Sequence, residues 1–274
     1  MNPFELFSYS FIWQAILGGL LIAIFTSLIG TFLVLKRLSL MGDSLSHVAL
    51  SGVSIGFLTK TSPLFVALPV VILSALGIIK LTKNEKIYAD SALGIISALG
   101  IALGLIIAAL AGGFNVDLMG FLFGSILTIS QAEVLLAAVL AVLSLILISY
   151  YYHELVAMTF DENFAKTAGV NTDKINTLLI VFSAACIVIA LKAVGIMLVS
   201  ALIIVPPSAA LQIANSFKKT LIYSCLFSCS SIILGIYFSF LLNLPSGAVI
   251  ILINLLILFI ILGVKYAFKK RKIA

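Results

Sequence analysis

The sequence predicts an all-α, polytopic membrane protein with about nine transmembrane helices, within a range of eight to ten. Of its 274 residues, 63% are hydrophobic and only 9% are charged, whereas soluble domains are about 45–50% apolar and about 25% charged. A helix needs about 20 apolar residues to cross a bilayer. Nine such runs, bounded by charged or turn residues, cover residues 11–35, 38–58, 63–81, 91–112, 131–151, 175–191, 193–214, 219–242 and 246–267. We therefore expect residues 1–274 to form a single transmembrane domain, with no room for a soluble one.

The first run sets the orientation of the chain. Lys36 and Arg37 follow it and no basic residue precedes it, which is the reverse of the charge order of a signal peptide. We expect it to remain as a transmembrane helix with the N-terminus outside and the C-terminus in the cytoplasm. Fourteen of the sixteen Lys and Arg residues then lie on the cytoplasmic side, where positive residues gather, and only Lys60 and Lys192 lie outside. This placement accounts for the net charge of +6 without a nucleic-acid partner.

The second run contains Asp43, the one acidic residue well inside an apolar segment. Asp43 lies roughly 9–10 Å from the cytoplasmic end of the predicted helix, and His47 lies one turn deeper on the same face. An ionisable group at such a depth costs about 2.5–3.5 kcal/mol and normally faces a polar cavity or a partner. Three serines share this face, within about 80° of Asp43: Ser39, Ser51 and Ser54. Such a polar stripe is typical of a helix that lines a path for a polar or ionic substrate.

A carboxylate and an imidazole four residues apart can form half of a site for a divalent ion such as zinc, manganese or iron. Two ligands bind weakly, but a two-fold homodimer around a central path would double Asp43 and His47. Weak coordination suits transport, because a tight site would not release its ion. We expect this ion as cargo and no permanently bound cofactor. The alternative is that Asp43 and His47 only pair with each other or cap a neighbouring helix.

Two connections are longer than a turn. The outer one, about residues 113–130, is too apolar for a free loop, so we expect a short helix near residues 118–128 that dips into the membrane. The inner one, about residues 153–174, is the only extended polar stretch on the cytoplasmic side. No glycine in the chain is followed by lysine, so a phosphate-binding P-loop is absent. If transport is driven by ATP, the ATPase is another chain, and residues 153–174 are the docking element.

Within this inner segment the residue types favour a short helix. Asp161 and Glu162 suit its N-terminus, and Gly169 suits its C-terminal cap. A small apolar face lies between them and consists of Phe164, Ala165 and Ala168. The alternative is a surface helix that merely joins two spans.

The run at residues 193–214 contains Pro206 and Pro207. Each proline lacks an N–H group and clashes with the preceding turn, so we expect the helix to kink or break there. A broken helix at membrane depth is tolerated only within protein or along a cavity. This segment is therefore a second candidate for the wall of the path, although kinks also serve packing alone.

Three segments resemble the permease subunit of metal-ion ABC transporters, the family that imports zinc, manganese or iron into bacteria. They are KRLSLMGDSLSHVALSGVSIGF at 36–57, FDENFAKTAGV at 160–170 and VGIMLVSALIIVPPSAALQIA at 194–214. The resemblance extends to size and span count, and so to essentially the whole chain. It implies a homodimer in the bacterial cytoplasmic (inner) membrane with two cytoplasmic ATPase subunits and an extracytoplasmic metal-binding protein. It also implies that Asp43 and His47 lie along the ion path and that residues 153–174 contain the coupling helix.

With this resemblance the leading hypothesis is the membrane subunit of an ATP-driven importer of a divalent metal ion. One alternative is a related importer of a metal chelate such as a siderophore or corrinoid. Another is a secondary transporter driven by an ion gradient, with Asp43 and His47 as a proton relay, and a third is a structural or assembly protein. The ligand types do not choose among zinc, manganese and iron, because Asp and His suit all three.

Overall fold

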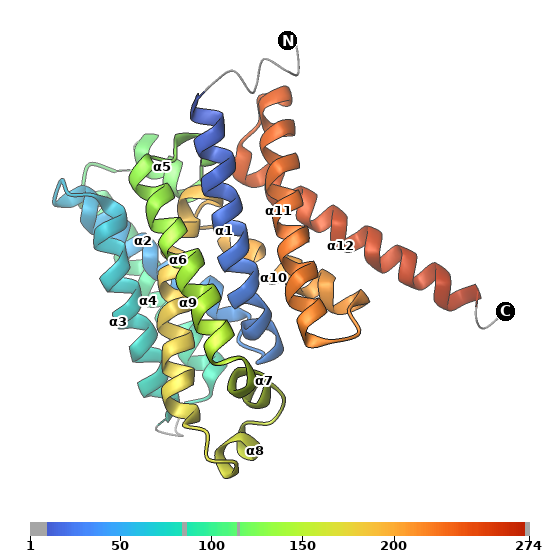
Figure 1. Cartoon of the computed structure of the whole chain (residues 1–274). Coiled ribbons are helices and arrows are strands. Elements are labelled where there is room, and N and C mark those ends of the chain that lie inside the picture. The colour runs from blue at the N-terminus through green and yellow to red at the C-terminus, as the bar shows by residue number, and fades with distance from the viewer. Residues whose placement is uncertain (1–9, 84–86, 114–115, 272–274) are drawn as a thin grey trace.

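The computed structural model describes residues 10–83, 87–113 and 116–271, and over these ranges the chain is a bundle of α-helices without strands (Figure 1). Each of the nine predicted runs coincides with one helix. These are α1 (Ser10–Leu35), α2 (Leu40–Leu58), α3 (Pro63–Lys83), α4 (Ala89–Leu110), α6 (Gln131–Tyr150), α9 (Thr172–Val194), α10 (Val199–Ile213), α11 (Phe217–Leu242) and α12 (Ser246–Arg271). The predicted all-α class is confirmed.

Within the described ranges, seven of these helices are long and apolar enough to cross a membrane, and the two others explain why the predicted count of nine is approximate. The seven are α1, α3, α4, α6, α9, α11 and α12. Helix α2 has 19 residues, but its polar residues lower its hydropathy. Helix α10 has 15 residues, which is about 22 Å of helix and short for a complete crossing.

Close backbone contacts hold α2 inside the bundle. A Cβ atom built on Gly52 would lie 2.5 Å from the Cα of Ala67 in α3, and one built on Gly100 in α4 would lie 2.7 Å from the Cα of Val48. Real Cβ atoms do not approach so closely, so α3 and α4 reach α2 only because glycine leaves the space. Helix α2 is therefore enclosed on two sides by α3 and α4, the two helices that follow it in the chain.

Helix α10 does not break at its prolines, contrary to one of the two outcomes that we predicted. It is continuous from Val199 to Ile213 and both prolines are buried inside it. Pro207 cannot donate to the Ile203 carbonyl, and this oxygen lies against Gly30 of α1, where an added Cβ would be only 2.2 Å away. The close packing of α1 supports the helix at this point. The chain breaks earlier instead, at Gly195, whose φ of 87° ends α9.

The short outer helix that we predicted is present. The connection contains α5 (Val116–Phe123) and the 3₁₀ turn η2 (Ile126–Thr128), and α5 lies at one end of the bundle (Figure 1). Ile126 is completely buried and fits against Gly19 of α1. Gly19 is nine residues into α1, so Ile126 contacts this helix about 13 Å along its axis from its first residue.

The inner connection forms two helices, α7 (Tyr152–Phe160) and α8 (Glu162–Thr167), which protrude at the end opposite to α5 (Figure 1). Aromatic contacts fasten α7 to the bundle. The ring of Phe217, at the start of α11, lies 5.3 Å from Phe32 of α1, 6.0 Å from Tyr152 and 6.3 Å from Phe160, measured between ring centroids. The inner segment is thus seated on the ends of α1 and α11.

Candidate functional site: an Asp–His pair on α2 and a helical segment at the inner end

Asp43 and His47 lie together on the one open side of α2. The distance from Asp43 Oδ2 to His47 Nε2 is 3.5 Å, and the side chains are 49% and 25% exposed. All the other residues from Met41 to Ser54 are buried, so between the exposed ends of α2 at Leu40 and Leu58 this pair is the open part of the helix. Asp43 is also in the first turn of α2, where the helix dipole stabilises a negative charge.

The predicted polar stripe is open at its inner end and closed further along. Ser51 is 5% exposed and Ser54 is fully buried. The Ser51 hydroxyl donates to the Val48 carbonyl at 2.7 Å, and the Ser54 hydroxyl has no hydrogen-bond partner. Ser39 precedes α2 at its N-cap without a side-chain cap bond. The chain itself therefore covers the face at Ser51 and Ser54.

The path-lining roles of the three serines and of the two prolines remain predictions. Pro206 and Pro207 are both buried within α10. The start of α10 does approach the pair on α2, because a Cβ on Gly42 would lie 3.7 Å from the Cα of Ser200. Helix α10 thus lies beside the start of α2, although by residues other than its prolines.

The chain supplies only part of a metal coordination shell. Across the described ranges there is no group of three or more His, Cys, Asp and Glu side chains that could hold an ion. Asp43 and His47 therefore offer two ligands, whereas a closed zinc site has four. An ion at this pair would need a second copy of the chain, or water, to complete its coordination.

The inner segment has the local structure that the sequence predicts. The Asp161 carboxylate caps α8 by accepting from the Phe164 N–H at 2.9 Å, and Glu162 pairs with Lys166 at 3.2 Å. At the other end Gly169 has φ of 87°, the left-handed conformation that glycine adopts most readily after a helix. Both helix boundaries that we expected for α8 are confirmed.

The apolar face that we predicted on α8 is divided by the structure. Ala165 is completely buried and packs with Leu155 and Met158 of α7 and with Ile175 of α9. Phe164 points the other way and is 65% exposed. Within α8, Phe164 is the large apolar side chain that is exposed, and Ala165 packs α8 against its own chain.

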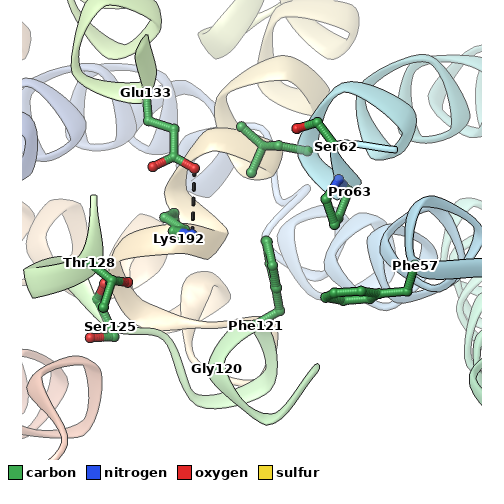
Figure 2. Close-up of a pocket in the computed structure, with 10 residues that line it drawn as sticks. Phe57, Ser62, Pro63, Gly120, Phe121, Ser125, Thr128, Glu133 and Lys192 are labelled. Atoms are coloured by element: carbon green, nitrogen blue, oxygen red, sulfur yellow. Dashed lines mark hydrogen bonds and ion pairs between the residues drawn. The ribbon is translucent and has the colours of Figure 1, made fainter. Parts of the chain in front are cut away.

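The outer end holds an ion pair that we did not single out from the sequence. Glu133 of α6 and Lys192 of α9 are 3.5 Å apart and only 16% and 23% exposed. They lie at the edge of a cavity of about 510 Å³, which Phe57 and Phe121 also line (Figure 2). Glu133 completes the capping box of α6 with Ser130, while Lys192 lies 4.9 Å from the centre of the Phe121 ring. The signal for this pair was that Lys192 is one of only two basic residues that we did not expect on the cytoplasmic side.

A helical membrane bundle with an ionisable pair on an inner helix and a helical protrusion at one end defines a polytopic membrane transport subunit. The model of the ABC 3 transport family matches residues 8–265, and the chain belongs to that family. It is a multi-pass membrane protein of an ABC transport system.

Named relatives cover nearly the whole chain. The manganese transport system membrane protein MntC of Listeria monocytogenes is 32% identical over 255 residues, which are 93% of this chain and 91% of that protein. The high-affinity zinc uptake system membrane protein ZnuB of Buchnera aphidicola is 28% identical, over 90% of this chain and 95% of that protein. Among solved structures, PsaBC from Streptococcus pneumoniae in complex with Fab contains a chain with a TM-score of 0.84 and 30% identity, and the match covers 94% of this chain and 92% of that one.

Proposed function

We propose that this chain is the membrane-spanning subunit of an ATP-driven importer of divalent metal ions, and that the transported ion contacts Asp43 and His47. The observation that carries the proposal is the open Asp43–His47 pair, 3.5 Å apart, on a stretch of α2 from Met41 to Ser54 that is otherwise buried in a membrane bundle. An ionisable pair at this position is costly in a membrane unless it serves a path or a partner. The relatives include a manganese transport system membrane protein and a zinc uptake system membrane protein, which favours these two ions over iron.

The proposed assembly is a two-fold homodimer. Two copies would bring together two Asp43 and two His47 side chains, which gives four ligands from a chain that offers two. Carboxylate and imidazole suit manganese and zinc alike. The side-chain exposures of 49% and 25% leave room for an ion to enter and leave.

The proposed partners lie at opposite ends of the bundle. Cytoplasmic ATPase subunits would dock on α7 and α8, with the exposed Phe164 at the contact, and would supply the ATP hydrolysis for which this chain has no P-loop. An extracytoplasmic metal-binding protein would deliver the ion to the end that carries α5. This arrangement requires the N-terminus outside and the C-terminus in the cytoplasm of a bacterial cell.

Metal uptake by cells that lack this chain tests the proposal. Cells would receive either the wild-type chain or an Asp43→Ala, His47→Ala variant, and zinc, manganese and iron uptake would be measured together. We expect the uptake of one metal to return with the wild type and not with the variant, at equal membrane abundance and with the ATPase still associated. Rescue by the variant would remove the pair from the path, and the absence of any metal response would favour a chelate or gradient-driven transporter.

A further inference from the structure

A half-buried lysine at the inner end, Lys36, lies between the segment that carries α8 and the helix that carries Asp43. Lys36 is the first residue after α1, and its ammonium group donates to the Oδ1 atom of Asn176 in α9. The side chain lines a cavity of about 210 Å³ whose walls also include Glu162 of α8 and Met41 of α2. One ammonium group is therefore placed among five helices, α2, α3, α4, α8 and α9.

The electrostatics show that Lys36 responds to α8. Burial lowers the pKa of Lys36, the negative charge of Glu162 raises it, and the positive charge of Lys166, also on α8, lowers it by a smaller amount. A partly buried ammonium is costly unless a partner compensates the charge, so the energy of Lys36 depends on where Glu162 and Lys166 lie. Glu162 is the first residue of α8 and moves with that helix.

The turn after Lys36 joins this residue directly to the start of α2. Its backbone is closed by three hydrogen bonds, from Lys36 N to Phe32 O, from Arg37 N to Val34 O and from Leu38 N to Leu33 O, at 2.9, 3.1 and 2.8 Å. Helix α2 begins at Leu40, so Asp43 follows within its first turn. Met41 and Leu38 line the same cavity as Lys36, so the start of α2 forms part of its wall.

We propose that Lys36 is a positioning residue that couples the movement of α8 to the Asp43–His47 pair through Glu162 and the turn before α2. The inference rests on the proposed function, because it requires an ATPase that moves α8. When α8 shifts, the charge of Glu162 shifts relative to Lys36. Lys36 follows it, and the rigid turn displaces the start of α2.

The experiment uses the complex of this chain with its ATPase subunits in lipid vesicles, supplied with its Mn²⁺-loaded capture protein. Both Mn²⁺ import and ATP hydrolysis are measured in the same vesicles. We expect Lys36→Met to lower the Mn²⁺ imported per ATP at least fivefold while ATP hydrolysis stays within twofold of wild type. A merely structural role would lower both activities together.

Two further variants make the test specific. Glu162→Gln, on the surface of α8, should lower the Mn²⁺ imported per ATP by a similar factor. The double variant with Lys36→Met should lower it no more than the stronger single change, because the two side chains act through the same interaction. Lys80→Met removes an exposed positive charge from the inner end of α3, a helix that also walls the cavity, and should leave the ratio within twofold of wild type.

The outcomes separate the inference from the function on which it rests. Wild-type vesicles that import no Mn²⁺ with ATP, and no Zn²⁺ when the capture protein carries Zn²⁺ instead, would overturn both. Wild-type import with an unchanged ratio in Lys36→Met and Glu162→Gln, or with losses that multiply in the double variant, would overturn only the role of Lys36. If Lys36→Met does not accumulate, Glu162→Gln decides, because it leaves Lys36 in place.

Discussion

Replacing Gly100 of α4 by alanine should disturb the Asp–His pair from behind. An added Cβ would lie 2.7 Å from both the Cα and the N of Val48, and 3.0 Å from the carbonyl carbon of His47. Ordinary contacts begin at 3.4 Å, so α2 and α4 must separate by at least about 0.7 Å at this point. The contacted atoms are backbone, which cannot rotate away as a side chain can.

This displacement is large on the scale that matters for metal binding. Ligand distances in metal sites hold within about 0.2 Å, and changes to the groups that orient a ligand cost about 10–100-fold in affinity. Overpacking a tight contact costs about 1–3 kcal/mol of stability. We therefore expect Gly100→Ala to weaken Mn²⁺ or Zn²⁺ binding at least tenfold and to lower the melting temperature.

The matched control is Gly94→Ala on the same helix, where an added Cβ meets nothing within 4 Å. This change should leave metal binding unaltered and stabilise α4 slightly, by up to about 1 kcal/mol. Metal titration and thermal unfolding of the purified chain in detergent measure both effects. If Gly100→Ala behaves like Gly94→Ala in both assays, the proposed closeness of α4 to the back of His47 does not govern the site.

Three further predictions concern the two ends of the bundle. Phe164→Ala should weaken association with the ATPase, measured by co-purification, because it removes a side chain that is 65% exposed; equal recovery of the ATPase would contradict the docking proposal. Burial places the pKa of Lys36 in the folded chain below its ordinary value of 10.5. Between the folded and the ordinary pKa the unfolded chain binds more protons, so the melting temperature should rise with pH in this range. The melting temperature of Lys36→Met should lack this rise, and the same slope in the variant as in the wild type would refute the assignment. Lys192→Met should lower stability by about 1–2 kcal/mol, between the values for surface and buried pairs, because it leaves the carboxylate of Glu133 without its cation; an unchanged thermal midpoint would show that the pair contributes nothing.

The sequence was sufficient for the helices and for the local structure of the inner segment. Runs of about 20 apolar residues admit few structures in a membrane, and the cap formed by Asp161 and the turn at Gly169 depend only on nearby residues. The helical spacing also placed Asp43 and His47 on one face correctly. These features are encoded within a few turns of helix.

Features that depend on distant segments were not predictable in the same way. The sequence could not show that Ser54 is covered while Asp43 is open, since other helices decide which part of a face is buried. It gave no sign that Gly30 would support the helix at Pro207, because this contact joins α1 to α10. The partners of Lys36 were hidden for the same reason, since Asn176 lies 140 residues further along the chain.

The most direct test of the central claim is ATP-dependent metal import by the purified complex in sealed vesicles, compared between the wild type and the Asp43→Ala, His47→Ala variant. We predict that Mn²⁺ or Zn²⁺ enters wild-type vesicles only with ATP and the loaded capture protein, and that the variant hydrolyses ATP but imports no metal. Equal import by the variant, or import that follows an ion gradient without ATP, would contradict it.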